Sequence, residues 1–241
     1  MNKKLERILP LVQKPARYVG GEYKQIVKDK KNVDLRVAFC FPDTYEIGMS
    51  NLGMRILYAI MNKMDGVWCE RVFAPWGDME QAMRENQIPL YGLESGDPLT
   101  DFDMIAFTIG YEMSYTNVLN MLRLGNIPLR ASERTELSPI VFAGGACMYN
   151  PEPLADFFDF FSIGEGEEMT PEILELYRKA KKEGWSKQEF LKAVAKIEGV
   201  YVPSLYEHSY KDDGTLAQIK ILDGAPEKVT KRIIQNLDDA L

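Results

Sequence analysis

Basic charge, histidine and long apolar runs are scarce in this chain of 241 residues, and each scarcity excludes a class of protein. Lys and Arg number 29 against 36 Asp and Glu, so the formal net charge is −7. A chain of this charge has no global field that favours nucleic acid, and no dense run of Lys and Arg forms a local basic patch. No apolar run approaches the roughly 20 residues of a membrane span. The N-terminus carries early positive charge without an apolar signal core behind it. We therefore expect a cytoplasmic protein that does not bind a membrane, and the sequence gives no independent reason to expect direct binding to nucleic acid.

Cysteine is also rare. Cys40, Cys69 and Cys147 are odd in number and widely spaced, which argues against a disulfide framework and fits a reducing compartment. The three thiols would have to meet in space to bind a metal, because the sequence contains no C-x-x-C and no C-x-x-x-C-x-x-C. Three ordinary, partly buried thiols are the favoured interpretation, and we predict no metal site.

Residues for self-contained catalysis are missing too. His208 is the single histidine, and it falls in an expected hairpin, away from the loops where a ligand would bind. The sequence has no G-x-S-x-G, no G-x-x-x-x-G-K-[ST] and no G-x-G-x-x-G. Asp43, Tyr45, Glu46 and Glu112 have side chains suited to proton transfer, but no spacing singles out a pair. We name no catalytic residue and do not expect a hydrolase or a kinase.

The chain does contain a regular alternation of strand and helix patterns. Apolar segments typical of buried strands cover residues 35–41, 68–74, 102–110, 140–143 and 160–163. Helical patterns cover residues 52–63, 78–85, 115–124, 170–182 and 186–196. This order predicts an α/β fold with a doubly wound, parallel, five-stranded sheet.

Four segments organise the chain. Residues 1–32 form an N-terminal helical segment, and residues 33–198 form the Rossmann-like domain. Residues 199–225 are expected to form a β-hairpin appendage, because apolar strands flank the turn sequence Lys211-Asp212-Asp213-Gly214. Residues 226–241 have mixed charge and are expected to be a tail or a linker.

The predicted binding site lies at the carboxyl edge of this sheet, where ligands bind in open α/β folds. Loops 42–53, 108–117 and 144–152 leave successive strands at that edge, with 164–168 nearby. Plain turns are the alternative for each of these loops. The candidate cofactor-binding residues are Asp43, Tyr45, Gly48, Thr108, Gly110, Gly144, Gly145, Gly164 and Glu165.

Several of these loops carry longer motifs. They are Pro42-Asp43-Thr44-Tyr45-Glu46-Ile47-Gly48-Met49-Ser50, Tyr111-Glu112-Met113-Ser114-Tyr115-Thr116-Asn117, the run from Gly144 to Leu154, Asp156, Asp159, and Ile163-Gly164-Glu165-Gly166-Glu167. Over about residues 15–240 the chain resembles the cobalamin-binding-like domain that precedes the catalytic barrel in cobalamin-dependent radical S-adenosylmethionine (SAM) proteins. The resemblance is to an uncharacterised branch, and it implies a flavodoxin-like strand order 2-1-3-4-5.

Two departures limit what the resemblance implies. Family members with a protein ligand to cobalt carry D-x-H-x-x-G, whereas Asp43, Tyr45 and Gly48 occupy that spacing here. A neutral phenol is a poor ligand at pH 7, because its pKa is near 10. The C-x-x-x-C-x-x-C that binds a [4Fe–4S] cluster in the barrel is also missing.

The resemblance therefore implies an accessory domain of a radical SAM enzyme that positions cobalamin, or another corrinoid, without a protein histidine. By itself this chain would be catalytically silent. SAM and the [4Fe–4S] cluster would belong to the barrel of a longer protein, which is also the expected partner; a naturally short protein is the alternative. The rival interpretation is a degenerate domain that binds no cobalamin and docks a substrate or a partner.

Overall fold

A computed structural model describes residues 3–222 and 224–235. Its main sheet has six strands in the order β2-β1-β3-β4-β5-β6. The strands are β1 (Leu35–Phe41), β2 (Val67–Phe73), β3 (Met104–Thr108), β4 (Ile140–Gly144), β5 (Phe160–Ser162) and β6 (Val200–Tyr201). The first five are parallel, which confirms the predicted sheet and its order 2-1-3-4-5.

The sixth strand corrects the expected start of the hairpin. Val200 and Tyr201 pair antiparallel with Ser162 and Phe161 of β5, instead of pairing within the appendage. A short chain reversal after the last helix brings these two residues back alongside β5. The appended hairpin is therefore shorter than predicted, with β7 at Tyr206–Tyr210 and β8 at Leu216–Ile221.

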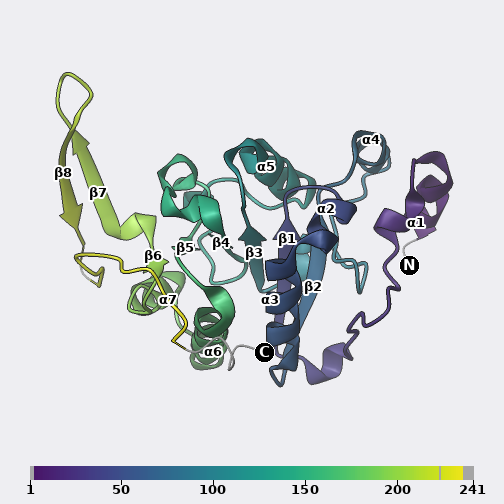
Figure 1. The fold of residues 1–241 in the computed structure, drawn as a ribbon, viewed down its shortest axis with the longest axis horizontal. Helices are drawn as coiled ribbons and strands as arrows, with labels where there is room; N and C mark the ends of the chain where they lie inside the picture. Colours follow the sequence, from purple (N-terminus) through teal and green to yellow (C-terminus); the bar gives the residue numbers. More distant parts are fainter. Residues whose placement is uncertain (1–2, 223, 236–241) are drawn as a thin grey trace.

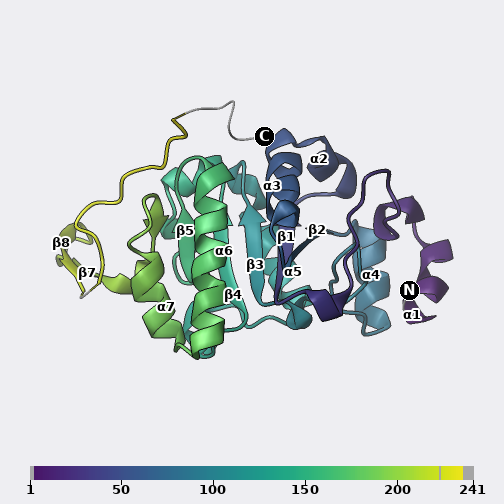
Figure 2. The same cartoon turned by 90° about the horizontal axis from the view of Figure 1, so that it is seen from below.

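Helices cover both faces of the sheet. The helices are α1 (Lys3–Ile8), α2 (Tyr45–Ser50), α3 (Leu52–Lys63), α4 (Gly77–Glu85), α5 (Tyr115–Leu124), α6 (Gly166–Glu183) and α7 (Lys187–Val194). Helices α1, α4 and α5 pack on one face, and α3, α6 and α7 on the other (Figures 1 and 2). The sheet is thus the middle of three layers.

Strand side chains alternate between these two layers. Along β1, Ala38 and Cys40 contribute to the core with α4 and α5, while Val37 and Phe39 contribute to the core with α3 and α6. This explains why the strand is apolar at nearly every position: neither face of the sheet is left to solvent.

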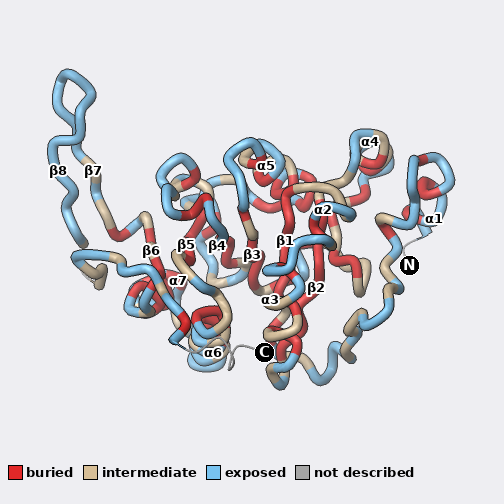
Figure 3. Tube along the Cα trace, in the orientation of Figure 1, coloured by how far each residue is buried: buried red, intermediate tan, exposed pale blue. Residues whose placement is uncertain are grey.

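The hairpin projects beyond the β6 end of the sheet, and its strands are largely exposed (Figures 1 and 3). The turn at residues 211–214 forms as predicted, with the Lys211 amide donating to the Thr215 carbonyl over 2.9 Å. The chain then returns to the sheet, where Arg232 forms an isolated parallel bridge with Gly164. Part of the expected linker is therefore docked on the domain; residues 236–241 lie outside the described residues.

Candidate functional site

The loops after β1, β3 and β4 are joined to one another at the carboxyl edge. The Tyr111 hydroxyl donates to the Asp43 carboxylate over 2.9 Å. The side-chain amide of Asn117 donates to the Pro42 carbonyl over 3.0 Å. Beyond the paired strands, the Ile109 amide donates to the Gly144 carbonyl over 2.8 Å. The loops predicted to form one site are thus brought together by side-chain and backbone contacts.

Two predicted site glycines serve protein packing. A Cβ on Gly145 would lie 2.6 Å from the Ile109 carbonyl oxygen, and the φ of this residue is +105°. A Cβ on Gly48 would lie 2.3 Å from the Phe73 ring. The backbone of the neighbouring loop, at Ile109, therefore fills the space beside Gly145, a candidate cofactor-binding residue.

Other predicted residues do face open space. A Cβ on Gly110 would meet no atom within 4 Å, and one on Gly144 would make only ordinary contacts, 3.7 Å from Ser162. Thr108 ends β3 and is partly exposed. These three positions leave part of the edge accessible to a ligand.

Tyr45 is held by its own protein. Its ring packs edge-on against Phe73, with ring centroids 5.4 Å apart. Burial, followed by interaction with the Glu22 carboxylate, raises the pKa of the phenol to about 12. The phenol therefore stays neutral at pH 7.

Next to Tyr45 lies a buried ionic cluster that the sequence analysis missed. The Arg71 guanidinium donates through Nε to Glu94 over 2.6 Å and through Nη2 to Glu22 over 2.8 Å. The Arg71 and Glu94 side chains are almost fully buried. The available signal was the Glu70-Arg71 pair within an otherwise apolar strand, since charged residues in a buried strand need partners.

Gly164 and Glu165 bind the C-terminal segment. The Glu165 amide donates to the Arg232 carbonyl over 3.0 Å, and the Glu165 carboxylate accepts from the Ile234 amide. Gly164 has a φ of +114°, and a Cβ there would lie 2.2 Å from the same Arg232 oxygen. In this structure the predicted acidic glycine turn contacts the chain itself.

Exposed apolar side chains also gather at the carboxyl edge. They are Ile47 of α2, Tyr111 and Met113 after β3, and Tyr149 after β4, here called the apolar edge patch, and they are 45–85% exposed. Large exposed apolar groups on adjacent loops are typical of binding surfaces. The sequence placed these residues on the right loops but did not show that they remain uncovered.

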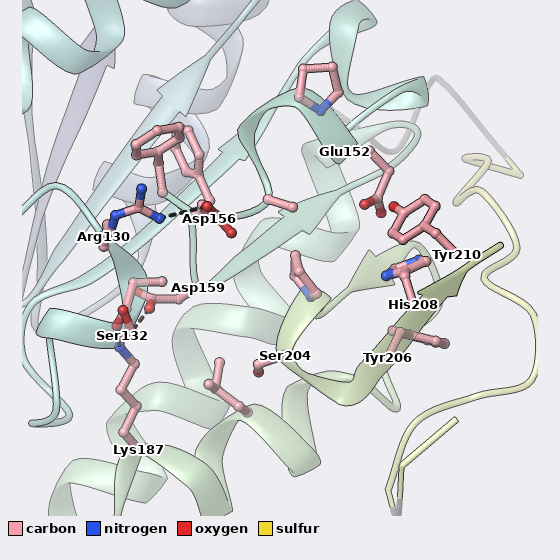
Figure 4. Close-up of a pocket in the computed structure, with 17 residues that line it drawn as sticks. Arg130, Ser132, Glu152, Asp156, Asp159, Lys187, Ser204, Tyr206, His208 and Tyr210 are labelled. Atoms are coloured by element: carbon pink, nitrogen blue, oxygen red, sulfur yellow. Dashed lines mark hydrogen bonds and ion pairs between the residues drawn. The ribbon is translucent and has the colours of Figure 1, made fainter. Parts of the chain in front are cut away.

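A separate hollow of about 590 Å³ lies between the loop at residues 130–132, α7 and the hairpin (Figure 4). Its floor contains Asp159, whose carboxylate contacts the Lys187 ammonium at 2.6 Å and the Arg134 guanidinium at 3.2 Å. Burial lowers the pKa of Lys187, although the Asp159 carboxylate opposes that change. Asp159 also accepts from the Val141 amide over 2.7 Å, so this residue of the sequence motif has a structural role.

His208 is closer to the predicted edge than the sequence indicated. It lines a second cavity, of about 560 Å³, together with Pro151 and Glu152 of the loop after β4 and Ile163 after β5. The base of the hairpin thus lies beside two carboxyl-end loops. Neither this cavity nor the one above includes the predicted cofactor-binding residues.

Residues 3–222 and 224–235 contain no group of three or more His, Cys, Asp and Glu side chains placed to hold a metal ion. Among the same residues, no helix combines the length and the apolarity of a membrane span. The three cysteines are buried and free.

The fold defines a class: a flavodoxin-like α/β domain, in which the carboxyl edge of the sheet is the usual ligand position. Residues 53–203 match the family described as "Radical SAM proteins, N-terminal", and the chain belongs to this family. It is an N-terminal, accessory domain of the radical SAM type.

One curated relative is the uncharacterized protein MJ0966 of Methanocaldococcus jannaschii. It is 30% identical over 132 residues, which are 54% of this chain and 24% of the relative. The chain thus spans about a quarter of the length of the curated relative that it matches. No solved structure matches the chain significantly.

Proposed function

We propose that the chain is the accessory domain that holds a corrinoid at its carboxyl edge in a radical SAM enzyme. The observation that carries this proposal is the apolar edge patch on the joined loops of a domain of the radical SAM N-terminal family. Apolar and aromatic side chains suit the face of a flat macrocycle, and the accessible backbone at Gly110 adds room beside it.

The residues fit a ring resting on the edge better than a nucleotide tail threaded into the domain. The space beside Gly145 holds the Ile109 backbone, and the space beside Gly164 holds the Arg232 backbone. Tyr45 presents a neutral phenol whose hydroxyl already interacts with Glu22. Because this position carries tyrosine and not histidine, no protein imidazole would ligate cobalt from it. A bound corrinoid would supply the organometallic chemistry, while Ile47, Tyr111 and Met113 would bind and orient it.

In this proposal SAM and a [4Fe–4S] cluster belong to a radical SAM barrel elsewhere in the full-length protein, because the sequence here lacks the cluster motif. That barrel is the intramolecular partner, and the isolated chain is catalytically silent. The three cysteines of the chain form no disulfide, which supports a cytoplasmic location for the protein.

A second candidate function is a docking module that binds no corrinoid. The Ile109 backbone fills the space beside Gly145, and the Arg232 backbone fills the space beside Gly164. Both glycines are accounted for by these protein contacts without a bound ligand, which favours the docking module. In this case the apolar edge patch would contact a substrate or a partner domain instead.

Corrinoid retention separates the two. The chain is mixed with hydroxocobalamin under anaerobic, reducing conditions, freed of unbound ligand and examined by visible absorption. We expect retained corrinoid whose spectrum lacks protein-imidazole ligation. Met113→Glu should lower retention roughly tenfold, because the apolar contact that the exposed Met113 would make with the bound ring is replaced by a charge. Tyr23→Ser is the matched control, since Tyr23 is 92% exposed and lies outside the edge. Absence of retention by the parent chain would favour the docking module.

A further inference from the structure

The β7–β8 hairpin has two chemically different faces. Cross-strand pairs on one face are Tyr206–Ile221, His208–Ile219 and Tyr210–Leu216. On the other face Glu207 pairs with Lys220 and Ser209 with Gln218, and the Glu207 carboxylate contacts the Lys220 ammonium at 2.9 Å. The first face is mostly aromatic and aliphatic, whereas the second is polar and charged. The first face is therefore suited to contact a ligand or another surface rather than water.

That apolar face forms one wall of the 560 Å³ cavity. The opposite wall is formed by Pro151 and Glu152 of the loop after β4, Ile163 after β5, and Tyr201 of β6. The cavity has the size of small-molecule sites, which are commonly about 300–1,000 Å³ and mostly apolar. Leu216, Ile219 and Ile221 remain 40–48% exposed. The hairpin and the sheet therefore leave between them a groove large enough for a small ligand, which we call the hairpin groove.

The aromatic rings of the hairpin groove are held in place. The Tyr201 hydroxyl donates to the Glu152 carboxylate, and the Tyr201 ring stacks on Phe161 with centroids 6.3 Å apart. The Tyr206 hydroxyl donates to the Pro226 carbonyl over 2.8 Å. The two tyrosine rings themselves are 5.1 Å apart. A ligand would meet a preformed aromatic wall, so its binding would cost little ordering of side chains.

The charge of the groove favours one kind of ligand. Its charged lining residues include the carboxylates Glu152 and Glu227, and the described lining contains no Lys or Arg. In Figure 4 the Glu152 carboxylate points toward His208 and Tyr210 of the hairpin. Aromatic faces attract cations, and a nearby carboxylate adds Coulombic attraction.

We propose that the hairpin groove binds a small organic cation with an apolar body, such as an alkylated or aryl-substituted ammonium. The apolar body contacts the aliphatic and aromatic walls, and the cation lies against a tyrosine ring near Glu152. This site is distinct from the apolar edge patch, and it does not depend on corrinoid binding.

The test compares two probes of the same shape. Benzyltrimethylammonium is titrated into the ¹⁵N-labelled chain and followed by two-dimensional NMR; neopentylbenzene, with carbon in place of the charged nitrogen, is titrated in parallel. We expect shifts at residues 201–221 and an affinity for the cation roughly tenfold above that for the neutral probe.

Variants then test the carboxylate. Glu152→Gln keeps the side-chain shape and an acceptor for Tyr201 but removes the charge, and it should weaken cation binding about three- to tenfold. Glu207→Gln is the matched control, because Glu207 lies on the opposite face of the same hairpin; it should leave affinity unchanged. Equal affinity for both probes, absence of shifts in the hairpin, or equal effects of the two variants would overturn the proposal.

Discussion

Glu22 and Tyr45 show how a single residue takes its role from its neighbours. Tyr45 occupies the position at which the spacing D-x-H-x-x-G would place histidine, yet its hydroxyl is directed to Glu22 and its ring packs on Phe73. Glu22 in turn contacts Arg71. The side chain at this position therefore ties the first loop to the buried ionic cluster.

The pH dependence of stability should reveal this connection. Burial alone would raise the pKa of Glu22, but interactions with Tyr45 and Arg71 outweigh it and lower the pKa. A carboxyl with a lowered folded-state pKa stabilises the fold above its unfolded pKa, near 4.5, and loses that contribution as pH falls through the folded value. Glu22→Gln should therefore lower the free energy of unfolding by about 1 kcal/mol at pH 7.

Urea unfolding of both proteins at several pH values measures this difference. The gap between parent and variant should shrink progressively as the pH falls below about 4.5. A gap that is the same at pH 7 and pH 3 would show that the charge of Glu22 contributes nothing.

Gly145 and Gly110 form a matched pair for testing which glycines the fold itself requires. Gly145→Ala places a Cβ 2.6 Å from the Ile109 oxygen at a φ of +105°, so we expect a loss of about 3 kcal/mol in unfolding free energy. Gly110→Ala meets no neighbour within 4 Å and should change stability by less than about 1 kcal/mol. Chemical denaturation of the two variants provides the measurement, and equal stabilities would contradict the packing role of Gly145.

At the scale of elements, Asp159 connects three parts of the chain. It lies just before β5, accepts from the Val141 amide of β4, and contacts Lys187 at the start of α7. Arg134, which lies in the loop before β4, approaches the same carboxylate. The helix that leads to β6 and the hairpin is thereby attached to the sheet.

Removing the charge of Asp159 should be costly. Asp159→Asn leaves Arg134 and Lys187 buried without their counter-ion, and we expect a loss of about 3–5 kcal/mol in unfolding free energy. Asp156→Asn is the control, because the Arg130–Asp156 pair is largely exposed and should contribute less than about 1 kcal/mol. Thermal or urea unfolding compares the two. Similar losses in both variants would show that burial of the Asp159 pair has no special effect.

At the scale of the whole molecule, the carboxyl edge and the hairpin present two separate surfaces. The first carries Ile47, Tyr111, Met113 and Tyr149, and the second is the hairpin groove with Glu152. The C-terminal segment passes between the hairpin and the start of α6, and Arg232 contacts Glu168 and Glu172 there (Figure 2). Among the described residues the apolar edge patch remains exposed, and Glu227 and Val229 of the C-terminal segment contribute to the lining of the hairpin groove.

Much of this architecture could be predicted from sequence. The segment 35–41 was predicted as a strand and forms β1 over the same residues, and the helix at 52–63 coincides with α3. The helix at 115–124 coincides with α5. These elements are encoded by the spacing of neighbouring apolar residues, and the parallel direction of the strands follows from their alternation with helices. The strand order was implied by the family resemblance.

Tertiary structure alone decided how distant segments meet. No local pattern indicates that Val200 and Tyr201 pair with β5, that Arg232 fills the space at Gly164, or that the hairpin forms a groove with Glu152. The sequence likewise placed Gly145 at a loop without showing that the Ile109 backbone lies against it. Periodicity reports which face of an element is buried, because neighbours along the chain share that face. It cannot report the partner that buries it, because that partner is chosen by the free energy of the whole packed chain.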